Sequence, residues 1–143
     1  MFFPMEKRFY LDTNIWRDYY ENRSDSLKSL GKPALNFLLG AIKEGNLIIY
    51  SELVVHELIS KYTKEEISAI FSIFYNLNIL VKAEISKNQA KEASDLCRKR
   101  NVPFGDALHA ILARDNGAML ITRDNHFKKL NGIAETKKPE ELI

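Results

Sequence analysis

The chain has little cysteine and no long apolar run. Cys97 is the single cysteine among 143 residues, so a disulfide within the chain is excluded, and a lone thiol is most often a small buried side chain. The apolar stretch at the start, MFFPMEKR, is far shorter than a signal peptide or a membrane span. Both absences favour a reducing, cytoplasmic setting.

Linkers, internal repeats and low-complexity tracts are also missing. With nothing to divide it, the chain is expected to form one domain over residues 1–143, with residues 1–4 as a loose extension before an alternative start at Met5. Hydrophobic residues make up 45% and charged residues 28%, a balance that excludes a disordered chain. The net charge of +2 permits a basic binding face but does not require one.

Short apolar runs alternate with helical patterns along the chain. The expected strands cover residues 8–11, 47–50, 79–81, 119–122 and, as a short last one, 133–135. The expected helices cover residues 14–21, Pro33 up to Gly45, 51–62 and 104–116, and two more begin at the capping boxes of Thr63 and Ser86. The helix after Pro33 has apolar residues at helical spacing, namely Leu35, Leu38, Leu39 and Ile42. Apolar strands without alternation, separated by helices, predict an α/β fold with a parallel sheet covered on both faces.

Two of the apolar runs end on an acid. Phe9-Tyr10-Leu11 runs directly into Asp12, and the run that begins at Met119 is followed by Arg123 and Asp124. In an open parallel sheet the functional crevice lies beyond the carboxyl ends of the strands, so we expect Asp12 and Asp124 to converge there. The alternative, open for each acid taken singly, is that it caps the helix or turn that follows.

Two further acids belong to apolar helices. Glu57 lies four residues after Leu53 and next to Leu58, which puts its carboxylate at the edge of a buried stripe. A carboxylate buried there must be protonated, bound to a metal, or paired, and a salt bridge with a lysine or arginine is the plain alternative. Asp106 opens a helix apolar enough to be largely buried, although an acid in a first turn also complements the helix dipole.

Four carboxylates around one crevice repel one another, and a divalent cation removes that conflict. Mg²⁺ and Mn²⁺ prefer oxygen ligands of this kind, and no grouping of histidine with cysteine suggests zinc. A site of carboxylates and a hard cation is suited to hydrolysing phosphodiesters. The residues therefore indicate a metal-dependent enzyme that acts on phosphates.

Three blocks of the sequence, LDTNIW, HEL and PFGDALHAILARDNGAMLITRDNHF, resemble the signature series of PIN-domain ribonucleases, especially the VapC-like toxins of toxin–antitoxin pairs. The resemblance spans nearly the whole chain and keeps the family order of four acids. It places the catalytic and metal-binding roles on Asp12, Glu57, Asp106 and Asp124. Asn14 and Thr122 match positions that support the metal site, and Asn125 stands where some relatives add a fifth acid.

The resemblance implies a fold, a cofactor and partners. It implies a single PIN-like domain with a parallel sheet of about five strands in the order 3-2-1-4-5, flanked by helices on both faces. It also implies Mg²⁺ or Mn²⁺ dependence and endonuclease activity on RNA. For the toxin members it implies a cognate antitoxin that blocks the site.

Several polar and aromatic residues are weaker candidates. Arg123, His126 and Lys128 are predicted to contact RNA, although charged runs such as Lys128-Lys129 are usually solvated surface. His109 lies one helical turn after Asp106, so it either supports the metal site indirectly or packs as a satisfied core histidine. One aromatic group follows the first acid, and its members belong either to the core or to a patch for an antitoxin or a second subunit: Trp16, Tyr19 and Tyr20.

Other classes of protein also place an acid after a strand. A phosphatase of the haloacid-dehalogenase type needs a second aspartate two residues after the first, where this chain has Asn14. A response-regulator module needs adjacent acids before its phosphoacceptor strand and a late lysine after a strand, and neither is found in those places. The remaining alternatives are a PIN nuclease with a housekeeping role in RNA processing and a PIN-like domain that binds RNA or protein without catalysis.

Overall fold

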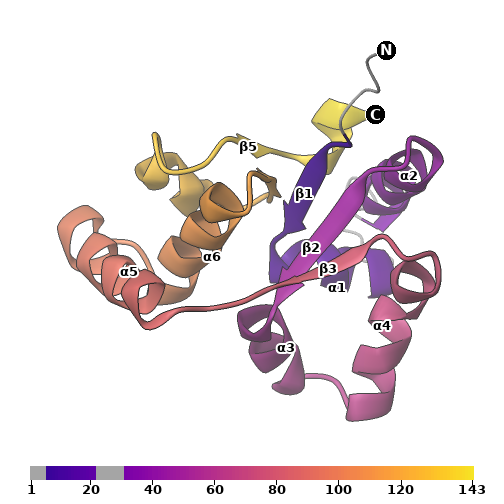
Figure 1. The fold of residues 1–143 in the computed structure, drawn as a ribbon, viewed down its shortest axis with the longest axis horizontal. Helices are drawn as coiled ribbons and strands as arrows, with labels where there is room; N and C mark the ends of the chain where they lie inside the picture. Colours follow the sequence, from indigo (N-terminus) through magenta and orange to yellow (C-terminus); the bar gives the residue numbers. More distant parts are fainter. Residues whose placement is uncertain (1–5, 22–30) are drawn as a thin grey trace, which may run out of the picture.

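Five parallel strands form one sheet in the order β3-β2-β1-β4-β5 (Figure 1). The computed structural model describes residues 6–21 and 31–143, so the extension predicted at residues 1–4 lies outside the described residues. The strands are β1 (Arg8–Leu11), β2 (Leu47–Ser51), β3 (Leu80–Ala83), β4 (Met119–Ile121) and β5 (Thr136–Lys137). The predicted α/β class, parallel sheet and strand order are confirmed.

Helices cover both faces of this sheet. They are α1 (Thr13–Glu21), α2 (Gly31–Lys43), α3 (Glu52–Ile59), α4 (Lys64–Asn76), α5 (Lys87–Arg100) and α6 (Phe104–Asp115), with short 3₁₀ helices η1 (Asn125–Leu130) and η2 (Pro139–Leu142). Figure 1 shows α5 and α6 on one side of the strands and α1 to α4 on the other. Helix α6 packs on β1 and β4 and contacts α5. None of the helices in residues 6–21 and 31–143 has the length and apolar character to cross a bilayer.

The central strands are mostly apolar because both of their faces are covered. Tyr10, Leu11, Ile48 and Leu120 are fully buried, as expected of a parallel sheet between two helical layers. Each connection between parallel strands has to cross over a face of the sheet, and the intervening helices provide these crossovers. The carboxyl ends of β1, β2 and β4 therefore point to one edge.

Local signals set several helix ends as predicted. Thr63 and Ser86 each form a capping box, in which the hydroxyl accepts from the backbone N–H three residues on and Glu66 or Gln89 accepts in return. Gly117, with φ +61°, takes the left-handed conformation that follows α6. These ends fix where α4, α5 and α6 start or stop.

Two details of the prediction are wrong. The buried side of α2 is formed by Ala34, Phe37, Leu38 and Ala41, whereas Leu35 and Leu39 are 42% and 51% exposed. Helix α2 is apolar on more than one side, so spacing alone could not choose the face that packs on the sheet. The last strand is not at residues 133–135 but at Thr136–Lys137, because β4 pairs there through Leu120↔Thr136 and Ile121↔Lys137.

Candidate active site

The predicted site residues lie at the carboxyl edge of the sheet. Asp12 follows β1 directly, and Asp124 follows β4 after Thr122 and Arg123. Glu57 is on α3, which begins at the end of β2, and Asp106 is in the first turn of α6. Four separate segments of the chain, at the ends of β1 and β4 and in α3 and α6, therefore bring acids from distant parts of the sequence to this edge.

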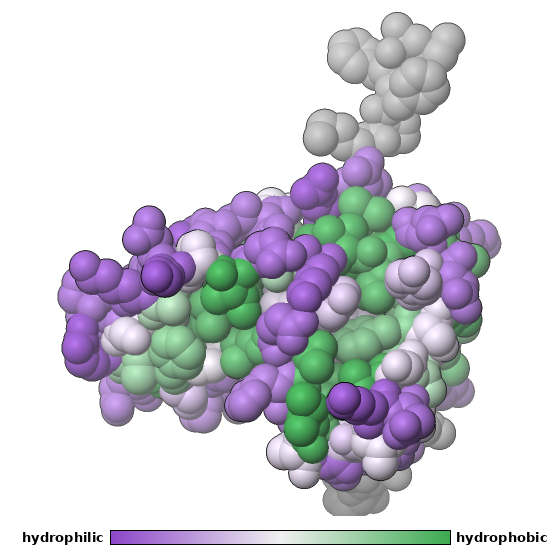
Figure 2. All heavy atoms as spheres, turned by 60° about the horizontal axis from the view of Figure 1, so that its bottom comes forward, coloured by the Kyte–Doolittle hydropathy of each residue, from purple (hydrophilic) through white to green (hydrophobic). Residues whose placement is uncertain are grey.

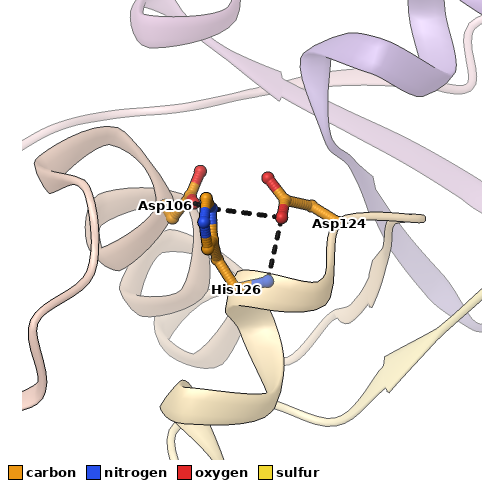
Figure 3. A group of neighbouring side chains, drawn as sticks. All are labelled: Asp106, Asp124 and His126. Atoms are coloured by element: carbon orange, nitrogen blue, oxygen red, sulfur yellow. Dashed lines mark hydrogen bonds and ion pairs between the residues drawn. The ribbon is translucent and has the colours of Figure 1, made fainter.

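Asp106, Asp124 and His126 form the tightest group of possible metal ligands in the described part of the chain (Figure 3). One ligand atom of each lies within 4.8 Å of those of the other two. The Nδ1 atom of His126 is 3.1 Å from Asp106 Oδ2 and 3.2 Å from Asp124 Oδ1. In Figure 3 the two carboxylates and the imidazole, from α6, the end of β4 and η1, approach one another. Two of the four predicted acids therefore share a cluster with a histidine.

Asp12 is tied to this cluster by Thr122. The Thr122 hydroxyl donates to Asp12 Oδ2 over 2.7 Å and accepts from the backbone N–H of Asp124 over 3.0 Å. Asp12 is only 5% exposed, and this burial raises the pKa of its carboxyl group although the nearby His109 and the Thr122 hydrogen bond act in the opposite direction. A single hydroxyl thus sets the position of one acid relative to the next.

Crowding of negative charge shows most clearly at Asp106. Burial, followed by the charges of Asp124 and Asp12, raises the pKa of Asp106 to about 6. The hydrogen bond and charge of His126 offset only part of this effect. An acid that resists ionisation beside two others is a physical reason for a cation at this place.

Glu57 behaves differently from the other acids. Its side chain is 39% exposed, so the prediction of a buried carboxylate is wrong. Burial acts to raise the pKa of Glu57, but the hydrogen bond and charge of His109, together with the Thr13 hydroxyl, outweigh it and hold that pKa below its usual range. The partner of this carboxylate is the imidazole of His109, with Nε2 2.6 Å from Oε1, and not the lysine or arginine of the plain alternative. Glu57 is therefore an ionised carboxylate next to the site.

Asp12 and Asp124 each lie at the candidate site and also cap the helix that follows, so the two alternatives for these acids are compatible. Asp124 Oδ1 accepts from the backbone N–H of His126 over 2.9 Å and caps η1. The Asp12 carboxylate likewise accepts a backbone hydrogen bond from Asn14, at the start of α1. Because a cap fixes the carboxylate relative to the backbone, these bonds hold both acids at the sheet edge.

The weaker candidates are spread over different environments. Arg123 is 16% exposed and contacts Asp18 over 3.3 Å and Glu140 over 2.6 Å, so an RNA contact by its guanidinium stays a prediction that requires an ion pair to open. Lys128 is exposed and lines a groove of 130 Å³ that Asp124 also lines.

The aromatic group after Asp12 divides between core and surface. Trp16 is fully buried and packs edge-on against Phe71 and Phe74. Tyr19 is half-buried, and Tyr20 is 38% exposed and contacts Tyr62. Trp16 is therefore a core residue, and only Tyr20 of the three offers a substantial exposed ring.

Sequence reasoning missed the partners of Glu57. Thr13 and Tyr10 carried no sequence signal beyond their place beside Asp12, although Thr13 donates to Glu57 and Tyr10 contacts His109. The spacing of His109 from Asp106 predicted an indirect contact with the site, and the structure places that contact at Glu57.

The donor set fits a hard divalent cation. Carboxylate oxygens, which Asp106 and Asp124 supply, are the preferred ligands of Mg²⁺ and Mn²⁺. The raised pKa of Asp106 and the 4.8 Å spread of the ligand atoms agree with a site that a cation would neutralise. Asp106 and Asp124 would hold the cation, with Asp12 beside them.

A parallel α/β sheet with acids gathered at its carboxyl edge defines the class of fold and a candidate cation site, and the comparisons with known proteins identify the family. The family model of the PIN domain matches residues 9–133, so the chain belongs to the PIN domain family, whose members are generally nucleases. No curated protein sequence matches it. Nineteen chains of solved structures do match.

One of these structures is VapBC2 from Rickettsia felis bound to a DNA fragment from their promoter. A chain of that crystal structure is similar to this protein with a TM-score of 0.66 and 23% sequence identity, over 92% of this chain and 98% of that chain. At this identity the likeness concerns the fold.

Proposed function

We propose that this protein is a divalent-metal-dependent endoribonuclease that hydrolyses RNA phosphodiester bonds at a site formed by Asp12, Glu57, Asp106 and Asp124. The observation that carries the proposal is that Asp106 and Asp124 lie in one cluster of possible metal ligands. Asp12 is also close, because its charge and that of Asp124 both raise the pKa of Asp106. Membership of the PIN family supports nuclease chemistry at this cluster. We place the protein in the cytoplasm, where its substrate would be found.

Each residue has a distinct part in the proposed reaction. When bound, Mg²⁺ or Mn²⁺ supplies positive charge to the scissile phosphate and makes an attacking water more nucleophilic. Asp106 and Asp124 would hold the cation, and Thr122 fixes Asp12 next to them. Glu57, whose pKa is lowered, stays ionised at neutral pH, so it would add negative charge to the cation site and can orient the attacking water.

A groove lined by lysine side chains lies beside the site and could bind the RNA strand. Lys128, Lys137 and Lys138 line the same groove as Asp124. Lysine side chains bind phosphate as point charges, so this groove suits the RNA backbone on one side of the cleaved bond. His126, which is exposed and contacts Asp106 and Asp124, would face the scissile phosphate.

Cleavage of RNA that depends on added metal is the direct test. Purified protein is expected to cut single-stranded or loop RNA in Mg²⁺ or Mn²⁺, to leave DNA of the same sequence intact, and to stop in EDTA. Gel analysis of end-labelled RNA measures all three. Cleavage that continues unchanged in EDTA would contradict the metal-dependent mechanism, and cleavage of DNA alone would contradict the substrate.

A protein that covers the site is the proposed partner, as in a toxin–antitoxin pair. The similar solved structure is a VapBC2 assembly. The described surface of this chain also carries exposed apolar side chains, including Ile59, Ile73, Tyr75 and Leu77. Figure 2 shows apolar areas framed by hydrophilic ones on the face where the lower side of Figure 1 comes forward. A second copy of the chain is the other partner that such areas could bind.

Growth of cells that express the protein distinguishes a toxin from a processing enzyme. Expression alone is expected to arrest growth, and co-expression of a small protein encoded beside it should relieve the arrest by binding the acidic site. A basic side chain that reaches the acids and an apolar helix would suit this role. Harmless expression of an active enzyme would favour the housekeeping alternative. Harmless expression of an inactive protein that still binds RNA would favour the non-catalytic one.

A further inference from the structure

A line of buried polar side chains runs through the sheet to Glu57. The hydroxyl of Ser51 lies 2.7 Å from that of Tyr10, which lies 2.7 Å from His109 Nδ1. On the other side of the imidazole, His109 Nε2 is 2.6 Å from Glu57 Oε1. Ser51, Tyr10 and His109 are 0%, 0% and 1% exposed. They come from β2, β1 and α6, so the line connects three elements to α3.

One hydrogen position in this line can be assigned, the one on His109 Nε2. The Glu57 carboxylate accepts, so His109 Nε2 must carry the donated hydrogen whether the ring is neutral or charged. With a neutral ring, Tyr10 donates to Nδ1 and Ser51 donates to Tyr10; with a charged ring both directions reverse. Burial raises the pKa of Tyr10 well above its usual range, so its phenol keeps its proton in either case. Tyr10 thus holds the imidazole with Nε2 aimed at Glu57.

Packing alone does not account for these residues. Ser51 is the N-cap of α3, yet its side chain makes no capping hydrogen bond and turns to Tyr10 instead. Buried polar groups cost free energy unless they are fully paired, and an apolar side chain would fill the same space without that cost. The line ends on the half-exposed carboxylate of Glu57 at the candidate site, so the buried hydrogen bonds can serve to orient that carboxylate.

The two donors to Glu57 engage the same oxygen. Thr13 donates to Oε1 over 2.7 Å, and His109 contacts Oε1 as well. The other oxygen, Oε2, lies on the side of Gly105, because a Cβ built there would be 3.5 Å from it. Gly105 precedes Asp106, so Oε2 lies beside the first turn of α6, the turn that carries Asp106.

We propose that His109, oriented by Tyr10 and Ser51, is a positioning residue that fixes Glu57 with Oε2 toward the cation site. The inference rests on the proposed metal-dependent nuclease function. It predicts that removing one oxygen atom from Tyr10, which touches neither metal nor substrate, weakens both metal binding and catalysis.

Tyr10→Phe is the decisive variant because it keeps the ring and its packing. Loss of a group that orients a metal-site residue typically costs 10-fold or more in metal affinity or activity. We expect Tyr10→Phe to weaken Mn²⁺ binding, measured by isothermal titration calorimetry, and to lower kcat, each by about 10-fold, with KM for RNA unchanged. His109→Gln, which can still donate to Glu57, should retain more Mn²⁺ affinity than His109→Leu.

Tyr62→Phe is the matched control, since Tyr62 is also buried but packs against Tyr20 away from the line. It should leave Mn²⁺ affinity and kcat unchanged. If the wild type binds Mn²⁺ and cleaves RNA, and Tyr10→Phe does both equally well, the positioning role is wrong while the proposed function stands. A Tyr10→Phe variant that only melts lower would overturn it too. A wild type that neither binds Mn²⁺ nor cleaves RNA would overturn both proposals together.

Discussion

Asp12→Asn is expected to abolish RNA cleavage, with a loss on the order of 10³-fold in kcat, because it removes a negative charge from the cation site. The asparagine amide oxygen can still accept from Thr122, the hydrogen bond that ties Asp12 to the strand end of Asp124. Burial raises the pKa of Asp12 and so favours a neutral side chain at this position. The loss should therefore arise in the chemistry, with a folded protein of unchanged circular dichroism.

A surface acid provides the control for this result. Asp95 on α5 makes an exposed ion pair with Arg98, and such pairs contribute little to stability. Asp95→Asn, purified in the same way, should cleave RNA at the rate of the wild type. Equal cleavage by wild type and Asp12→Asn would instead point to a contaminating nuclease and remove the basis for the assignment.

The acids after β1 and β4 could be predicted from sequence because their positions follow from burial. An apolar run that stops at a carboxylate marks where a covered strand leaves the sheet, and the carboxyl ends of parallel strands meet at one edge. Asp12 and Asp124 lie at that edge as expected. Asp106 was expected at the start of an apolar helix, and it lies in the first turn of α6.

The environment of Glu57 could not be predicted in the same way. Helical periodicity gave the side of α3 on which it lies, but not how far α3 projects past the sheet, and so the carboxylate was expected to be buried. Its partner His109 is 52 residues away on α6. Their contact depends on how α3 and α6 approach each other across the sheet edge, which no local pattern encodes.

Tyr10 and His126 show two further limits. Tyr10 lies inside an apolar run and reads as a packing residue, because the partners of its hydroxyl come from other elements, 41 and 99 residues away. His126 reaches Asp106 because Asp124 caps η1 and turns the chain back over α6. A turn of this kind is set by a cap and by packing together, and the sequence showed only the cap.

Asp106→Asn is expected to melt no lower than the wild type in EDTA at neutral pH, and clearly lower than the wild type in millimolar Mn²⁺. The folded-state pKa of Asp106 is about 6, against an ordinary value of 3.8. The folded protein therefore binds this proton more tightly than the unfolded chain, so stability from this group is full below pH 4 and is lost as pH rises through about 6. Asparagine does not ionise and avoids that loss, which we put on the order of 1–3 kcal/mol at neutral pH.

Differential scanning fluorimetry across pH and metal concentration measures this prediction. In EDTA the melting temperature of the variant should exceed that of the wild type increasingly from about pH 4 to pH 7, by roughly 3–10 °C at pH 7. Below about pH 4 the two melting temperatures should be equal. Mn²⁺ should raise the melting temperature of the wild type more than that of the variant, because stabilisation grows with affinity for the folded state.

Asp115→Asn on the same helix should behave in the opposite way. Arg114 lowers the pKa of Asp115, so its contribution to stability is present at neutral pH and is lost as pH falls. If Asp106 instead served as the partner of a buried cation, Asp106→Asn would cost about 3–5 kcal/mol because the partner charge would be stranded. A large loss in EDTA, with no effect of Mn²⁺ on the wild type, would show that Asp106 is a structural acid and would remove the cation from the proposed mechanism.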